Sequence, residues 1–181
     1  MEISKPINVL FYGHVFLYDK GLKINLSGIL TDIMYKYDYI NFVISKSTVG
    51  FGDICIDCIS HLNHAFKGKK ITLTFDNKKP SKYFDIIISY IYKDLDISAY
   101  KSLMKAETSG VKIIDLTCEE TKDKIHNNIR FLPERARYVF EQRNEGTTLL
   151  ALSQELGLST TRISTIDYGA RLSLKKMLHV F

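Results

Sequence analysis

The sequence of 181 residues has no tryptophan, only three prolines and only three cysteines. Because Cys55, Cys58 and Cys118 are few and odd in number, they exclude a disulfide framework. No apolar run approaches the ~18 residues that a membrane-spanning helix needs. The N-terminus lacks the basic and apolar regions of a secretion signal. We therefore predict a cytoplasmic protein with reduced thiols and no membrane partner.

Arginine is absent from the first 129 residues, although 17 lysines occur there. All six arginines lie between Arg130 and Arg171, and Lys175 and Lys176 are the only lysines in the last 52 residues. The net charge of +5 is too mild to indicate a nucleic-acid binder by itself. Chance in a lysine-favouring gene is the alternative explanation of the split. The change from lysine to arginine predicts two domains, residues 1–120 and 121–181.

The first domain alternates short apolar runs with helical periodicity, which predicts an α/β fold with a mainly parallel sheet of about five strands. The second domain reads as helices only, so the predicted fold class is an α/β domain followed by an all-α domain. The expected strands are residues 7–12, 39–45, 70–75, 85–91 and 111–116, and the expected helices between them are residues 22–37, 53–66 and 98–109.

Two loops at the expected carboxyl ends of strands are candidate ligand sites, because parallel sheets bind ligands at that edge. One contains Gly13 and His14, and glycine lets the backbone approach a phosphate closely. The other loop runs from Ser45 to Asp53. Turns without a ligand explain both loops equally well, and helix capping alone would explain Asp53. The candidate ligand-binding residues are Gly13, His14, Ser47, Thr48, Gly50, Gly52 and Asp53.

The stretches FYGH at 11–14, VGFGD at 49–53 and SAYKSLMKAETSGVKIIDL at 98–116 resemble the SLOG superfamily. These Rossmann-like nucleotide-sensing domains are related to the DNA-processing protein DprA and to phosphoribohydrolases that release cytokinin. The resemblance implies a nucleotide-like ligand, and no other cofactor is expected. Since this segment has no arginine to match the catalytic one of those enzymes, we expect no enzyme. A nucleotide phosphoribohydrolase that uses His14 and Asp53 is the alternative.

Cys55 and Cys58 form a C-x-x-C pair that is followed by His61 and His64. On a helix, steps of three residues spread these four side chains over half the circumference, so they cannot enclose one tetrahedral metal ion. We expect no metal site there. Buried small side chains on the apolar face are the preferred interpretation of the two cysteines.

The second domain contains a helix-turn-helix pattern. The helix LLALSQEL at 149–156 is followed by Gly157 and then by a long helix from about Thr160 to His179. The leading turns of a second helix of this kind enter the major groove of DNA. Arg162 is the best candidate for reading a base, because guanidinium pairs with guanine in a bidentate manner. A helical bundle with a solvated polar face is the alternative. The candidate DNA-binding residues are Ser159, Thr160, Thr161, Arg162, Ser164, Thr165, Tyr168, Arg171, Lys175 and Lys176, the last three of which could instead form ion pairs within the domain.

The stretch LPERARYVFEQRNEGTTLLALSQELGLSTTRISTIDYGARLSLKK at 132–176 resembles region 4 of primary sigma factors. The resemblance implies binding to double-stranded DNA at a promoter. Nothing upstream matches the promoter-melting region of a sigma factor, so we do not expect a complete sigma factor. We predict a DNA-binding transcription regulator that forms a homodimer. A tail that docks on RNA polymerase is a further alternative.

Overall fold

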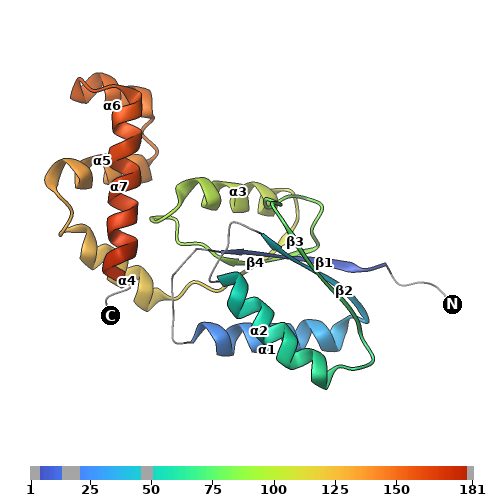
Figure 1. Cartoon of the computed structure of the whole chain (residues 1–181). Helices are drawn as coiled ribbons and strands as arrows, with labels where there is room; N and C mark the ends of the chain where they lie inside the picture. Colours follow the sequence, from blue (N-terminus) through green and yellow to red (C-terminus); the bar gives the residue numbers. More distant parts are fainter. Residues whose placement is uncertain (1–4, 14–20, 46–50, 179–181) are drawn as a thin grey trace. The chain divides into compact units, whose positions relative to one another are not determined.

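The computed structural model describes residues 5–13, 21–45 and 51–178. Strands and helices alternate over the first part of the chain, and helices alone follow (Figure 1). In chain order the elements are β1 (Ile7–Gly13), α1 (Leu22–Lys36), β2 (Tyr39–Ser45), α2 (Phe51–Ala65), β3 (Lys70–Asp76), β4 (Ile86–Tyr90), α3 (Ile97–Thr108), β5 (Lys112–Asp115), α4 (Glu119–Ile129), α5 (Glu134–Glu145), α6 (Leu149–Leu156) and α7 (Thr160–Leu178).

The strands form one five-stranded sheet in the order β3-β2-β1-β4-β5. Every neighbouring pair is parallel. Strands β2 and β3 lie on one side of β1, and β4 and β5 lie on its other side. The direction of winding therefore changes between β1 and β4, which flank the topological switch point. The predicted fold class, an α/β part with a Rossmann-like parallel sheet followed by a helical part, is confirmed.

The chain divides into two compact units. The α/β unit comprises Met1–Ile91 and Ser98–Thr117, and the helical unit comprises Tyr92–Ile97 and Cys118–Phe181. The short segment after β4 thus belongs to the helical unit, whereas the predicted first domain included it. The predicted boundary after residue 120 falls inside the first turn of α4.

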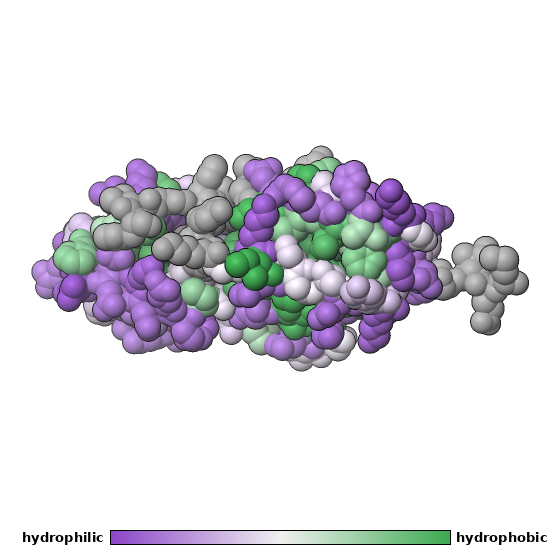
Figure 2. Space-filling view, turned by 90° about the horizontal axis from the view of Figure 1, so that it is seen from below, coloured by the Kyte–Doolittle hydropathy of each residue, from purple (hydrophilic) through white to green (hydrophobic). Residues whose placement is uncertain are grey.

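The sheet of the α/β unit is covered on both faces, which explains why its central strands are nearly continuous apolar runs. Helices α1 and α2 pack together on one face (Figure 1). Figure 2 shows this side of the molecule, where hydrophobic residues are interspersed among hydrophilic ones. On the other face, Ala99, Leu103 and Ala106 of α3 pack against Leu10 of β1 and Ile87 of β4. The core of the unit therefore lies in two layers around β1 and β4.

The connection from β3 to β4 differs from the others because residues 77–85 contain no helix. Phe84 from this connection is buried and joins the cluster beneath α3. A polar ladder crosses the three neighbouring strands on the same face, because Thr72 donates to the Asn41 side chain and Asn41 donates to that of Asn8. The two edge strands, β3 and β5, contain no fully buried residue.

The switch point is filled by an aromatic ring. Phe51, the first residue of α2, is fully buried and its ring lies 5.5 Å from that of Tyr90 between centroids. A Cβ atom built on Gly13 would lie 2.3 Å from the Phe51 ring. Gly13 is therefore required by the packing of the Phe51 side chain.

Most predicted elements match the observed ones within two residues, and two differences matter. Helix α2 already includes Phe51, so Asp53 lies within its first turn and not at the residue that precedes the helix. Helix α4 was not predicted, because Ile125 and Ile129 are its only apolar residues. Within the described residues, no helix is long and apolar enough to span a membrane.

We predict that Gly13→Ala destabilises the protein by about 1–3 kcal/mol, because the new methyl group overlaps the buried Phe51 ring. Gly28→Ala is the matched control, since a Cβ there meets no atom within 4 Å and Gly28 lies inside α1. That control should stabilise by about 0.5–1 kcal/mol. Urea denaturation followed by circular dichroism measures both, and equal stability of Gly13→Ala and wild type would contradict the packing role.

Candidate nucleic-acid interface

The turn between α6 and α7 is closed by local hydrogen bonds. Gly157 ends α6 in the left-handed conformation, with φ 64°. The Ser153 hydroxyl donates to the Leu158 carbonyl, and the Leu158 amide donates to the Ser153 carbonyl. Ser159 then caps α7 by accepting a bond from the Arg162 amide at 3.2 Å. The predicted helix-turn-helix is therefore present, and its turn is set by residues of the turn itself.

A small apolar core holds α6 against α5 and α7. Val139, Leu152 and Ile163, one from each helix, are completely buried and touch one another. Thr148 caps α6 by accepting a hydrogen bond from the Ala151 amide at 3.1 Å. These contacts fix the direction of α7 and leave its opposite side to the solvent.

The predicted residues on the leading turns of α7 form one exposed surface, which we call the recognition face. Part of it borders an open groove of about 530 Å³, to which Leu149 of α6 also contributes. Tyr168 exposes 69% of its surface. The Arg162 guanidinium has no ion pair within the described part of the chain. The recognition face consists of Ser159, Thr160, Thr161, Arg162, Ser164, Thr165 and Tyr168, all of which are exposed.

Arg171, also predicted to contact DNA, instead lies inside the helical unit and is only 8% exposed. Its guanidinium stacks on the Phe140 ring and pairs with Asp167 at 2.9 Å. It also donates to the Asp94 carbonyl at 2.6 Å and to the Asn144 side chain at 3.1 Å. The intradomain alternative therefore holds for Arg171, and a direct DNA contact by this residue is excluded by its burial.

Asp167 is the only acidic residue of α7, and two arginines neutralise it. Arg171 contacts one carboxylate oxygen, and Arg143 lies 3.9 Å from the other. Arg143 also donates to the Thr147 carbonyl at 2.6 Å, at the start of α6. Because this carboxylate is nearly buried and paired, α7 presents no free negative charge to a polyanion.

The two lysines near the end of α7 differ. Lys176 is exposed, as a phosphate contact requires, whereas Lys175 is half-buried. Burial lowers the pKa of the Lys175 ammonium, with Arg171 adding to that effect, and the Asp96 carboxylate opposes it. Lys175 therefore faces the segment after β4, and Lys176 is the better candidate for a phosphate contact.

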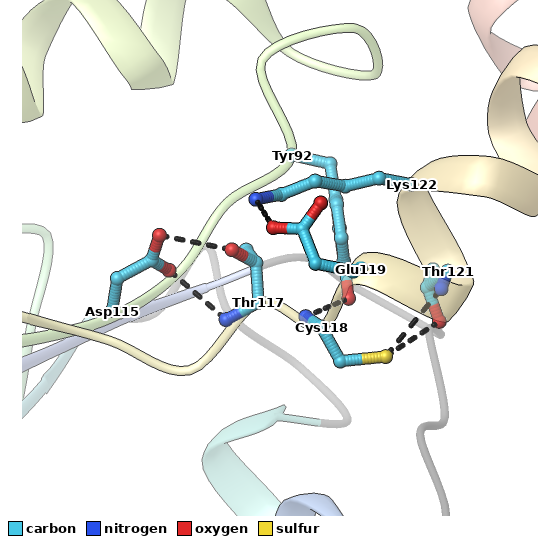
Figure 3. A network of polar contacts seen from close by, with 7 residues as sticks. All are labelled: Tyr92, Asp115, Thr117, Cys118, Glu119, Thr121 and Lys122. Atoms are coloured by element: carbon cyan, nitrogen blue, oxygen red, sulfur yellow. Dashed lines mark hydrogen bonds and ion pairs between the residues drawn. The ribbon is translucent and has the colours of Figure 1, made fainter.

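The segment Tyr92–Ile97 is a part of this unit that sequence reasoning missed. The Tyr92 hydroxyl accepts the Cys118 amide at 3.0 Å, and Cys118 in turn caps α4 through its sulfur (Figure 3). The Asp94 carboxylate accepts the Asn144 side chain at 3.2 Å and lies 3.7 Å from His126. Asp94 and Arg171 are far apart in the chain, so their contact leaves no periodic pattern in the sequence. Sequence periodicity therefore could not have predicted it.

A second groove, of about 400 Å³, lies on the outer side of α5 and is bounded by Leu156. Arg135 and Arg137 line it together with Glu134 and Glu141. Tyr138 donates its hydroxyl to Glu155, and this bond raises the pKa of the phenol. The mixed charges cancel locally, which makes this groove a weaker candidate for a phosphate backbone than the recognition face.

In the α/β unit, four of the predicted ligand-binding residues, His14, Ser47, Thr48 and Gly50, lie outside the described residues. Gly13 and Gly52 are buried and Asp53 is exposed. The structure therefore describes three of the seven predicted ligand-binding residues.

The two cysteines of α2 are buried, as the preferred interpretation expected. Burial raises the pKa of the Cys55 thiol, and the neighbouring Cys58 adds to the effect. No group of three or more potential ligands is placed to hold a metal ion within the described parts of the chain.

Comparisons with known proteins return nothing that assigns a family, because no family model, no curated protein and no solved structure matches the chain. Any function must therefore be argued from the residues themselves.

We predict that Arg171→Met lowers the free energy of unfolding by about 2–4 kcal/mol, because it leaves a nearly buried carboxylate and the Asp94 carbonyl without their main partner. Arg162→Met on the same helix is the matched control and should change stability by less than about 0.5 kcal/mol. Urea denaturation monitored by circular dichroism compares them. Similar midpoints for the two variants would show that the Arg171 contacts do not stabilise the unit.

Proposed function

We propose that the chain binds double-stranded DNA through the helix-turn-helix of α6 and α7 and acts as a transcription regulator, with the α/β unit pairing two copies. One observation carries the proposal. The predicted base-reading residues are exposed together on the leading turns of α7, directly after the left-handed turn at Gly157. A helix-turn-helix reads DNA by inserting these turns into the major groove.

The dimensions of α7 fit this role. Its 19 residues span about 28 Å at 1.5 Å per residue, so its first half can enter a groove while its second half packs in the protein. The buried residues Ile163, Ala170 and Leu174 hold the inner side of the helix. The similarity of residues 132–176 to region 4 of sigma factors supports the same use of the helix.

The charge of the recognition face supports binding to a polyanion, although only weakly. Arg162 is its only cation, Lys176 lies further along α7, and Asp167 is neutralised by Arg143 and Arg171. Few phosphate contacts mean a modest affinity and a shallow dependence on salt for one copy. Two linked copies that read two half-sites would overcome this weakness.

The α/β unit supports a pairing role better than a nucleotide-sensing role. The Phe51 ring fills the position beside Gly13 at the switch point, where a Rossmann-like sheet binds a phosphate. A buried ring in that position favours a unit that is packed for stability.

We predict salt-dependent binding to a labelled random-sequence duplex pool, measured by fluorescence anisotropy between about 50 and 200 mM salt. Lys176→Ala should reduce the slope of log K against log salt by about 1. Arg162→Ala should remove about 1–3 kcal/mol of the preference for a duplex selected from that pool.

Lys105→Ala on α3 is the control, since this residue lies in the α/β unit and should leave both quantities unchanged. Binding that is absent at every salt concentration would refute the proposal. An Arg162→Ala variant that keeps full preference for the selected duplex would refute the role of this residue.

Thr165 gives the recognition face a particular chemistry. Its hydroxyl donates to the Thr161 carbonyl at 2.9 Å, one turn back along the helix. Because the hydroxyl is hydrogen-bonded within the helix, the methyl group is the part of this side chain that would contact bases in the major groove. A methyl group contacts the C5-methyl of thymine in the major groove. Thr165 therefore favours thymine in the bound sequence.

We predict that a selected duplex binds more weakly when deoxyuridine replaces its thymines, because this change removes only the C5-methyl group. Thr165→Ser keeps the hydroxyl and loses the methyl, so it should bind the two duplexes more equally than wild type does. Competition anisotropy with wild type and variant measures the four affinities. Equal weakening by deoxyuridine in both proteins would assign the methyl contact to another residue.

A further inference from the structure

Strand β3 lies at one edge of the sheet, with β2 as its only neighbour in the described structure. Its outer edge presents main-chain amide and carbonyl groups that the sheet does not use. The strand is seven residues long, whereas the opposite edge strand, β5, has only four. Phe75 exposes 52% of its surface, and Ile71 and Leu73 are only partly buried. A long apolar edge of this kind is a ready surface for strand addition.

The sequence of β3 carries few of the devices that protect an edge strand. Charges, proline and bulges normally keep edges from pairing with another chain. Between its two charged ends, Lys70 and Asp76, the strand ITLTF contains no charged residue and no proline. All seven residues remain in continuous register with β2, so no bulge turns the edge away.

The same seven residues are complementary to themselves when reversed. Antiparallel pairing of two copies about Leu73 places Lys70 opposite Asp76 of the other copy and Ile71 opposite Phe75. Thr72 then faces Thr74, and the two Leu73 residues meet on the axis. Opposite charges, β-branched residues with aromatic residues, and threonine pairs are the combinations that stabilise antiparallel neighbours.

The two faces of the strand agree with this register. Side chains alternate along a strand, so Ile71, Leu73 and Phe75 share the apolar face, and Lys70, Thr72, Thr74 and Asp76 share the other. When two copies of the strand pair antiparallel about Leu73, the apolar side chains of both copies lie on one face of the joined sheet, and the polar side chains lie on the other. A shift by one residue would place apolar side chains opposite polar ones and lose the charge pairs.

We propose that β3 pairs antiparallel with β3 of a second copy across a two-fold axis at Leu73, which joins two five-stranded sheets into one of ten strands. The interface is isologous, as a closed dimer requires. This inference specifies the interface of the pairing that the proposed function invokes and rests on that pairing, whereas the DNA contact is tested separately.

The test exchanges the charges at the two ends of β3. Lys70→Glu places a glutamate opposite Asp76 twice in each dimer, and Asp76→Lys places a lysine opposite Lys70 twice. Each variant alone should dimerise at least about ten-fold more weakly than wild type in sedimentation equilibrium at low salt. An equimolar mixture of the two variants restores both opposite-charge pairs and should recover most of the wild-type association.

The equimolar mixture distinguishes a charge contact between two copies from an effect of the substitution on the folding of one copy. Lys70 and Asp76 lie at opposite ends of the strand, about 20 Å apart at 3.3 Å per residue, so they cannot contact each other in one chain. Both side chains are exposed, and equal thermal melting of the variants checks that they fold. The double variant Lys70→Glu/Asp76→Lys should dimerise like the mixture.

Three results would overturn the proposal in distinguishable ways. A wild-type chain that stays monomeric at all concentrations would refute the pairing of copies itself. A dimer that both single variants leave unchanged would refute β3 as its interface and leave the pairing intact. Weak association in the mixture as well as in the single variants would refute the antiparallel register.

Discussion

The helical unit depends on the nearly buried guanidinium of Arg171. A charge out of contact with water requires several partners, and here an aspartate, an amide side chain, a main-chain carbonyl and an aromatic ring supply them. The partners come from α5, from α7 itself and from the segment after β4, so one side chain ties three parts of the unit together. This arrangement and the apolar core of Val139, Leu152 and Ile163 together set the orientation of α7, and with it the recognition face. Because Arg171 is held in the interior of the unit, Arg162 is the one cation on the recognition face.

The α/β unit depends on a different constraint, the fit of the Phe51 ring against Gly13. In a sheet with this strand order, the carboxyl ends of β1 and β4 open a crevice at the switch point. Here Gly13 lets the Phe51 ring pack against Phe11 of β1. A Cβ atom at position 13 would overlap that ring, so the end of β1 and the start of α2 constrain each other.

Sequence reasoning succeeded where structure depends on local periodicity. The strands β1, β2 and β4 are mainly apolar runs, and the caps Thr148 and Ser159 and the turn at Gly157 are set by near neighbours. The same reasoning failed where the deciding contact is distant. Arg171 and Asp94 are 77 residues apart, and nothing in either local sequence distinguishes a buried arginine from a DNA-binding one. Helix α4 escaped because a helix with two apolar residues shows hardly any periodic pattern, and its stability comes from packing against α7.

The weak charge of the recognition face and the open edge of β3 both bear on the affinity of the proposed complex with DNA. A single helix that presents one arginine gains little from counterion release, so the DNA complex that we propose would be weak for one copy. Joining two copies makes the second contact intramolecular and raises affinity without any new contact to DNA. It also restricts binding to sequences whose half-sites match the spacing of the two helices. A recognition helix with few charges binds poorly to random DNA, and a dimer then provides affinity only at paired sites. On this argument the sparse charge of α7 favours specificity, provided that the edge strand supplies the second copy.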